Sequence, residues 1–217
     1  MRTIVVWDVP TRLFHWLVAA LVAAAYVTWR LDWMEWHAWA GYALLVLVLF
    51  RLVWGFVGSE TARFAAFLAP PRRVLRHLAH VFRREPDRQC GHNPAGGWMV
   101  VLLLVLLLGE ALTGVYVNND IADQGPLTEI VPAPIADLID ALHTSGLWQA
   151  LLAAVALHVL AIAVYATAKG QNLVRPMITG RKLLPAETRP PALAGPRRAL
   201  TVLGVGVAAV AALVNLL

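Results

Sequence analysis

Five long apolar runs, separated by polar, proline-rich or glycine-containing segments, organise this chain. They predict helices at about 12–29, 37–56, 97–117, 143–168 and 199–217. Each run holds roughly 20 residues, which is the length that an α-helix needs to cross the hydrocarbon core of a bilayer. Asp8 and Pro10 form a helix-start signal before the first run. Because these two residues interrupt the N-terminal segment, we interpret the first run as a retained helix and not as a cleaved signal peptide.

The pattern predicts an all-α integral membrane protein. We expect a four-helix transmembrane bundle in residues 1–183, a basic, proline-rich linker at 184–198, and an extra transmembrane helix at 199–217. In the connection between the second and third helices, residues 71–84 read PRRVLRHLAHVFRR. This mixture of arginine and apolar residues is typical of an amphipathic segment that lies on a membrane surface.

The composition supports a membrane protein. Of the 217 residues 59% are hydrophobic and only 14% are charged, whereas soluble domains carry about 25% charged residues. The mean hydropathy is +0.66. The single cysteine, Cys90, excludes an intramolecular disulfide, and the absence of a Cys-x-x-Cys-His motif excludes a covalent c-type haem site.

Lysine and arginine fall almost entirely on one side of the predicted bundle. Sixteen of the 18 basic residues lie in the N-terminal segment, the 59–97 connection and the 169–198 tail. The opposite connections hold one basic residue, Arg30, and seven acidic residues: Asp32, Glu35, Asp120, Asp123, Glu129, Asp137 and Asp140. Because basic loops are retained in the cytoplasm, we predict a cytoplasmic N-terminus and outward-facing 30–36 and 118–141 connections. This distribution explains the net charge of +5 without a nucleic-acid partner, and we expect none.

Four histidines fall at two levels of this topology. His15 and His158 lie towards the cytoplasmic side, and His37 and His143 lie near the outer side. His143 and His158 are about 22 Å apart along one helix and point broadly to the same side of it. The histidines therefore form two pairs at matching levels, His15 with His158 and His37 with His143. Two imidazoles from facing helices are a common way to hold a haem, and two filled axial positions suit electron transfer.

Other interpretations of the histidines remain open at this point. A single histidine at a helix end is more often an interfacial residue than a metal ligand, and this applies to His37 and His143. Zinc is a rival metal, although each pair supplies only two of the usual four ligands. We interpret His77 and His80, which lie among arginines, and His92, in the GHNP turn, as surface or phospholipid-facing residues.

Two charged residues inside the predicted spans are accessory candidates for a site. Arg51 can snorkel to the cytoplasmic headgroups, or it can pair with a haem propionate. Glu110 lies about two turns from the outer end of its helix. A carboxyl group at this depth should be protonated or hydrogen-bonded. It can bond to a neighbouring helix or carry protons for a quinone.

Several segments together resemble a known family. WDVPTRLFHW, HAWAGYALLVLVLFRLVWGFVGSETARFAAFL, GHNPAGGW and NLVRPMITGRK are similar to the prokaryotic cytochrome b561 and nickel–iron hydrogenase b-type cytochrome family, over about residues 3–183. The resemblance implies a four-helix bundle in the bacterial inner membrane that holds two non-covalent b haems. It also implies electron exchange between a redox partner and quinone. The family's ligand positions match His15, His37, His143 and His158. The long acidic 118–141 connection and the 199–217 helix depart from the family core and leave the partner open.

We therefore expect an electron-transfer subunit of an oxidoreductase system that connects a periplasmic redox partner with the quinone pool. The candidate partners are a hydrogenase small subunit, a soluble c-type cytochrome and superoxide, as in the oxidase-like branch of the family. An acidic outer face repels superoxide and favours a basic protein such as a c-type cytochrome, docked on the 118–141 connection. A haem-free membrane anchor or scaffold is the competing class. A second copy of the chain, packed through the glycine- and alanine-rich 199–217 helix, is a further candidate partner.

Overall fold

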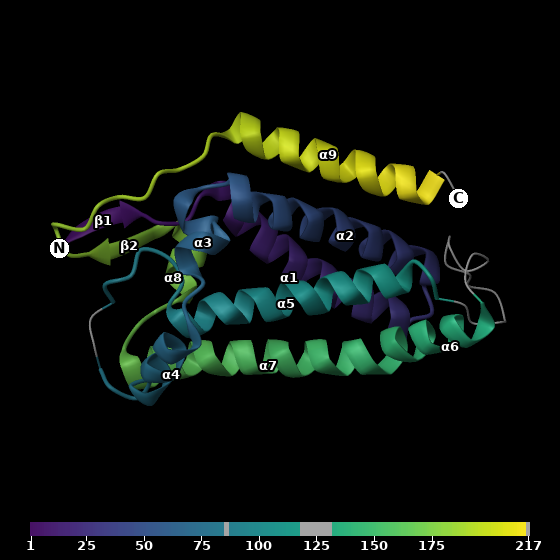
Figure 1. The fold of residues 1–217 in the computed structure, drawn as a ribbon, viewed down its shortest axis with the longest axis horizontal. Helices are drawn as coiled ribbons and strands as arrows, with labels where there is room; N and C mark the ends of the chain where they lie inside the picture. The colour runs from purple at the N-terminus through teal and green to yellow at the C-terminus, as the bar shows by residue number, and fades with distance from the viewer. Residues whose placement is uncertain (85–86, 118–131, 216–217) are drawn as a thin grey trace.

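In a computed structural model of the chain, which describes residues 1–84, 87–117 and 132–215, the long helices run side by side along one axis (Figure 1). Five helical stretches are long and apolar enough to cross a membrane. They are α1 (Val9–Arg30), α2 (Met34–Val57), α5 (Pro94–Gly114), the stretch Ala133–Lys169, and α9 (Pro196–Asn215). The predicted helical membrane fold with a fifth C-terminal span is confirmed.

The fourth span begins ten residues earlier than predicted. It consists of α6 (Ala133–Ala141), the π-helical segment η3 (Leu142–Leu147), α7 (Trp148–Val164) and a second π-helical segment, η4 (Tyr165–Lys169). The prolines of the 118–141 region predicted a connection. Pro132 instead occupies the N-cap of α6 and Pro134 lies in its first turn, where a helix needs no backbone N–H donor.

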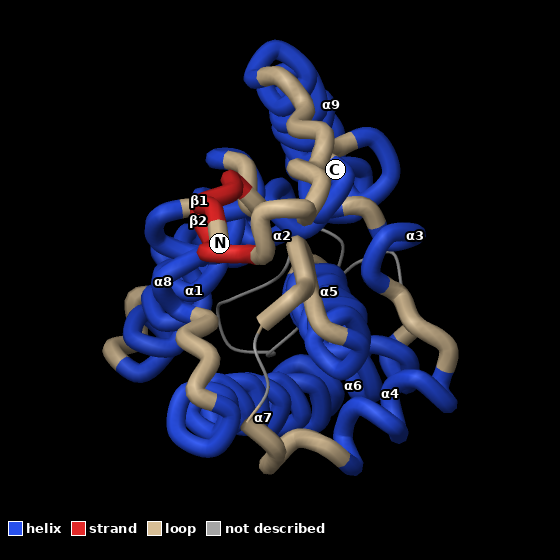
Figure 2. The backbone as a smooth tube through the Cα atoms, turned by 90° about the vertical axis from the view of Figure 1, so that its left-hand side faces the viewer, coloured by secondary structure: helices blue, strands red, loops and turns tan. Residues whose placement is uncertain are grey.

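The helices α1, α2, α5 and α7 pack together, and α9 lies beside α2 (Figure 2). α2 packs against α1, α5 and α9, and α5 also packs against α7. The buried centre of the group consists of Val18, Leu44, Val48, Leu107 and Leu151. Because lipid tails are as apolar as these side chains, close packing and not water exclusion holds them together.

The short elements gather at one end of the bundle (Figure 1). They are β1 (Arg2–Val5), η1 (Glu60–Ala62), α3 (Phe64–Phe67), α4 (Pro71–Ala79), α8 (Val174–Thr179) and β2 (Arg181–Leu184). α4 lies within the predicted amphipathic segment and leaves Leu75 67% exposed. The three basic segments of the sequence thus meet at the same end, as the charge pattern predicts for a single side of the membrane.

A two-stranded antiparallel sheet joins the segment before α1 to the segment after α8. The prediction of an all-α chain did not include this sheet. β1 pairs with β2 so that Arg2 lies opposite Leu184 and Val5 opposite Arg181. The pairing continues where the backbone N–H groups of Val6 and Trp7 donate to the carbonyl of Gly180, at 2.8 and 3.2 Å. Strands of four residues are too short to give a clear alternation in the sequence.

Asp8 connects α1 to α2. Its Oδ1 accepts a hydrogen bond from the backbone N–H of Thr11 at 2.7 Å and caps α1, and its Oδ2 accepts one from Trp54 Nε1 at 3.2 Å. A side-chain cap of this kind contributes about 1 kcal/mol. Asp8 is 6% exposed and Trp54 is fully buried, so this contact fixes the start of α1 against the end of α2.

Arg51 does not snorkel to the membrane surface. It is only 2% exposed, and its guanidinium carbon lies 5.4 Å from the ring centroid of Phe64 and 6.0 Å from that of Phe67. The reason is that α3 folds back over the end of α2 and covers the guanidinium with these two aromatic rings. Snorkelling requires an open path to the headgroups, and here the chain itself closes it.

The 184–198 segment is docked against the bundle. The backbone N–H of Ala192 donates to Glu60 Oε2 at 2.9 Å, and the backbone N–H of Glu60 donates to the Ala192 carbonyl at 2.9 Å. The backbone N–H of Ala194 donates to Ser59 Oγ at 2.8 Å. These contacts direct the chain to the position where α9 packs on α2.

At Gly180 the backbone passes close to the backbone of Trp7. Comparison with Gly170 tests how much this close approach matters. Gly180 and Gly170 both have left-handed backbones, with φ of +76° and +71°. A Cβ at Gly180 would lie 2.8 Å from the Trp7 carbonyl oxygen, whereas one at Gly170 would meet nothing within 4 Å. We expect Gly170→Ala to cost about 1–2 kcal/mol through its backbone alone. Gly180→Ala should cost about 1–3 kcal/mol more through the clash. Thermal unfolding in detergent measures both, and equal losses would contradict the close approach.

Candidate functional site

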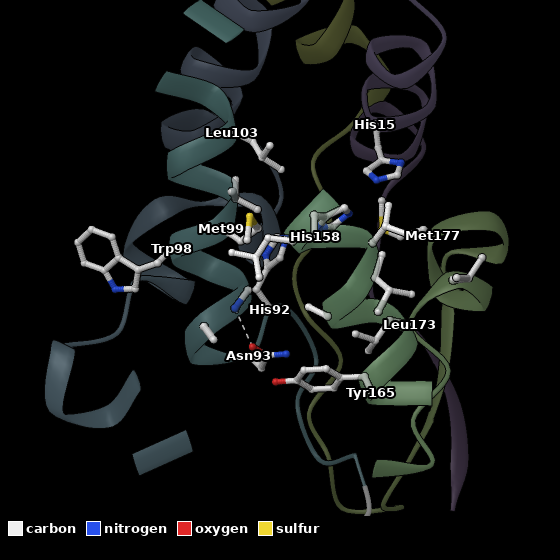
Figure 3. Close-up of a pocket in the computed structure, with 18 of the residues that line it drawn as sticks. His15, His92, Asn93, Trp98, Met99, Leu103, His158, Tyr165, Leu173 and Met177 are labelled. Carbon is white, nitrogen blue, oxygen red and sulfur yellow. Dashed lines mark hydrogen bonds between the residues drawn. The ribbon is translucent and has the colours of Figure 1, made fainter. Parts of the chain in front are cut away.

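His15 and His158 face each other from α1 and α7 (Figure 3). Their ring centroids are 6.3 Å apart. Both line a cavity of about 1410 Å³ between α1, α5, α7 and the loop before α5. Sites for small organic ligands usually enclose about 300–1,000 Å³, so this cavity has room for a large cofactor. Nδ1 of His15 is buried, and no described residue forms a hydrogen bond with it.

His37 and His143 form a second pair near the opposite end of the bundle. Their ring centroids are 6.2 Å apart. His37 Nδ1 lies 2.9 Å from the Ala25 carbonyl oxygen, and His143 Nδ1 lies 3.0 Å from the Glu110 carbonyl oxygen. Because a carbonyl oxygen only accepts, each Nδ1 carries the proton and each Nε2 keeps a free lone pair. This is the arrangement in which a second interaction orients a metal-binding imidazole.

The close approach of α5 positions His143. A Cβ at Gly114 would lie 2.9 Å from His143 Cε1, so only glycine leaves the ring its place. His143 also lies in η3, a π-helical segment of the kind that occurs often at functional sites. The spacing of His143 and His158 predicted from a regular α-helix does not include this wider turn.

The separation of the rings within each pair fits a metal ion held between two imidazoles. A metal–nitrogen bond of about 2.0–2.1 Å on each side places the two ring centroids about 6 Å apart. Both observed separations, 6.3 and 6.2 Å, match this value. Among the described residues, no group of three or more His, Cys, Asp or Glu side chains could hold a metal. The pairs therefore fit a metal whose other ligands come from a macrocycle, as in haem, better than tetrahedral zinc.

Glu110 lies beside the outer pair. Its Oε1 is 3.7 Å from His143 Nδ1, and its Oε2 is buried with no hydrogen-bond partner in residues 1–84, 87–117 and 132–215. The backbone carbonyl of the same residue, and not its carboxyl group, makes the short contact with His143. The hydrogen bond between η3 and α5 therefore involves the backbone of Glu110. The Oε2 atom of its carboxyl group is left for another partner.

Two histidines interpreted from sequence as surface or phospholipid-facing instead line the cavity. The ring of His92 packs between Trp7 and Phe67, with centroids 4.6 and 4.7 Å away, and burial lowers its pKa to about 3. His77 is hydrogen-bonded to the Tyr165 hydroxyl. The GHNPAGG sequence carried a signal for His92, because it places this residue directly before Asn93, the N-cap of α5.

Five candidate spans and two facing imidazole pairs define a class, that of multi-pass helical membrane proteins suited to hold haem between helices. Residues 6–180 match the family described as Prokaryotic cytochrome b561, and the chain belongs to this family. It is therefore a b-type cytochrome of the membrane, and haem binding and electron transport follow from the family.

Three relatives of the chain share one description. The chain is 25% identical over 212 residues to the "Probable Ni/Fe-hydrogenase B-type cytochrome subunit" of Azotobacter chroococcum mcd 1, covering 82% of this chain and 88% of the relative. It is 26% identical over 216 residues to the protein of the same description from Bradyrhizobium diazoefficiens, covering 83% and 86%. The corresponding Rhizobium leguminosarum bv. viciae protein is 24% identical over 218 residues, covering 84% and 90%. No solved structure gives a significant match to the chain.

Proposed function

We propose that the protein is a di-haem b-type cytochrome that transfers electrons between a periplasmic redox partner and the quinone pool. His15 and His158 hold one haem, and His37 and His143 hold the other. The observation that carries the proposal is the presence of two imidazole pairs with ring centroids 6.3 and 6.2 Å apart. A haem bound in such a pair supplies reversible one-electron transfer.

The chain's own residues restrict each pair to this role. Each pair would supply two imidazoles to a bound haem, which would leave the iron no open position for a substrate and so suits electron transfer. In the outer pair, the hydrogen bonds to the Ala25 and Glu110 carbonyls hold both rings in one tautomer and one orientation. The buried centre of the bundle, around Val48 and Leu151, is apolar.

We propose that the protein lies in the bacterial inner membrane with its N-terminus in the cytoplasm. The distribution of basic residues supports this orientation, because 16 of 18 lie in three segments whose elements meet at one end of the bundle (Figure 1). With five spans, the end of α9 then lies outside. His37 and His143 form the pair nearest the periplasm in this orientation.

A nickel–iron hydrogenase is the favoured redox partner. The support comes from the relatives, each of which is described as a probable Ni/Fe-hydrogenase B-type cytochrome subunit. A basic c-type cytochrome is a second candidate, which the exposed outer acids Asp32, Glu35 and Asp137 favour. Asp120, Asp123 and Glu129, which contributed to that expectation, lie outside the described residues.

Substitution of the proposed ligands should remove the haems selectively. We expect about two haems per wild-type chain by pyridine haemochrome assay. His15→Ala and His158→Ala should deplete one spectral component, and His37→Ala and His143→Ala the other, because each pair loses half of its axial ligands. His80→Ala is the control, since the ring of His80 contacts the Arg76 carbonyl and does not line the cavity. One haem or none in the wild type, or depletion of one component by both His15→Ala and His143→Ala, would overturn the pairing.

Membrane vesicles of known sidedness test the partner and the orientation together. We expect purified hydrogenase and dihydrogen, added from outside, to reduce the haem in right-side-out vesicles and not in inverted ones. The reason is that the enzyme should reach only the face that carries His37 and His143. Reduction only in inverted vesicles would contradict the orientation, and reduction in neither would contradict the hydrogenase partner. A basic c-type cytochrome, added in its reduced form to the same vesicles, tests the second candidate.

A further inference from the structure

His92 lies in the wall of the cavity that contains His15 and His158, but it belongs to neither imidazole pair. Its ring is held between the rings of Trp7 and Phe67. Its Nδ1 is buried and has no hydrogen-bond partner among the residues that the structure describes. Buried polar atoms in folded proteins are nearly always hydrogen-bonded. His92 as a whole is half-buried and lines the cavity, so a group that binds in the cavity can contact its ring.

Asn93 places a second hydrogen-bond donor beside this ring. Its side-chain oxygen accepts a hydrogen bond from the backbone N–H of Gly96 at 2.7 Å and caps α5. The other end of the amide is therefore its nitrogen, which can only donate. Asn93 lines the same cavity as His92, and Figure 3 shows its amide nitrogen facing the cavity.

The charges at this end of the cavity favour an anion. Among the described residues, Arg88 and Lys182 line it together with Asp87, and Asp87 is paired with Lys182 at 2.7 Å. The buried guanidinium of Arg51 lies close enough to His92 to act on its charge, and within the described part of the chain its Nη1 has no hydrogen-bond partner. The neighbouring Asp8 offsets part of the charge of Arg51. The remaining positive charge, together with two neutral donors, suits a carboxylate, which accepts charge-assisted hydrogen bonds.

We propose that His92 and Asn93 form a carboxylate-binding site that holds a propionate of the haem carried by His15 and His158. This inference rests on the proposed function, because it takes that haem as the molecule in the cavity. Haem fits the chemistry, since it carries two carboxylates on one edge of an apolar macrocycle. His92 is then a positioning residue that fixes the orientation of the cofactor and does not bind the iron.

The rate at which haem leaves the purified holoprotein for excess apomyoglobin tests the proposal. His92→Phe keeps an aromatic ring between Trp7 and Phe67 but removes both nitrogens. Because a hydrogen bond to a charged group is among the strong ones, we expect the inner haem to leave about 10- to 100-fold faster. The outer haem should leave at the wild-type rate. His158→Ala identifies the inner component, and His80→Phe, at a histidine outside the cavity, is the control.

Two further variants separate hydrogen bonding from packing. His92→Gln keeps a donor and should restore slow release. Asn93→Asp keeps the helix cap but replaces the donor with a negative charge, and it should accelerate release of the inner haem as His92→Phe does. Wild-type release rates in both His92→Phe and Asn93→Asp would overturn the proposal.

Haem dimethyl ester, in which neither propionate is charged, identifies the group that is held. Apoprotein reloaded with this ester should release it at the same rate from the wild type and from His92→Phe. Faster release of the ester from His92→Phe would show that His92 acts on something other than a propionate, and the proposal would fail. A wild-type protein that binds no haem at all would instead contradict the proposed function.

Discussion

Imidazole rings inside a membrane span need partners, and the placement of four such rings in two facing pairs is the constraint on which this structure depends. Water cannot solvate them at that depth, and an unpaired polar group in hydrocarbon is costly. In the outer pair each ring donates a hydrogen bond from Nδ1 to a backbone carbonyl, that of Ala25 for His37 and that of Glu110 for His143. What remains on each of these rings is one lone pair, which a metal ion can use. The ring separations of 6.3 and 6.2 Å in the two pairs are close to the distance that two imidazoles and a metal would require.

The elements at the other end of the bundle fix the distance between the helices that carry His15 and His158. Asp8 ties the start of α1 to Trp54 near the end of α2, and β1 ties the same start to β2, which follows the fourth span. α1 and the fourth span are the two elements that carry His15 and His158. Through these contacts a short sheet and one carboxylate set the positions of two histidines that lie at opposite walls of a cavity. The left-handed backbone of Gly180, the residue before β2, allows β2 to pair with β1.

Much of this arrangement is readable in the sequence, for identifiable reasons. The apolar runs fix the spans because hydrocarbon thickness fixes helix length, and the arginine distribution sorts their ends. Levels along the helices then bring His15 to His158 and His37 to His143. The sequence pattern does not reveal contacts between segments that are brought together only when the chain folds back on itself. The burial of Arg51 depends on α3 folding back over α2, and the position of His92 depends on Trp7 and Phe67, which are distant in sequence. The early start of α6 was hidden because Pro132 and Pro134 are compatible with both a loop and a first helical turn.

The electronic structure of the oxidised irons tests the central claim most directly. Electron paramagnetic resonance and near-infrared magnetic circular dichroism of the purified ferric protein distinguish axial ligands without relying on a substitution. If each haem lies between two of the four histidines, two low-spin ferric species with the charge-transfer bands of bis-imidazole ligation should be observed. A high-spin ferric signal from either haem, or the band of a histidine–methionine pair, would contradict the claim that His15, His158, His37 and His143 form two complete axial pairs.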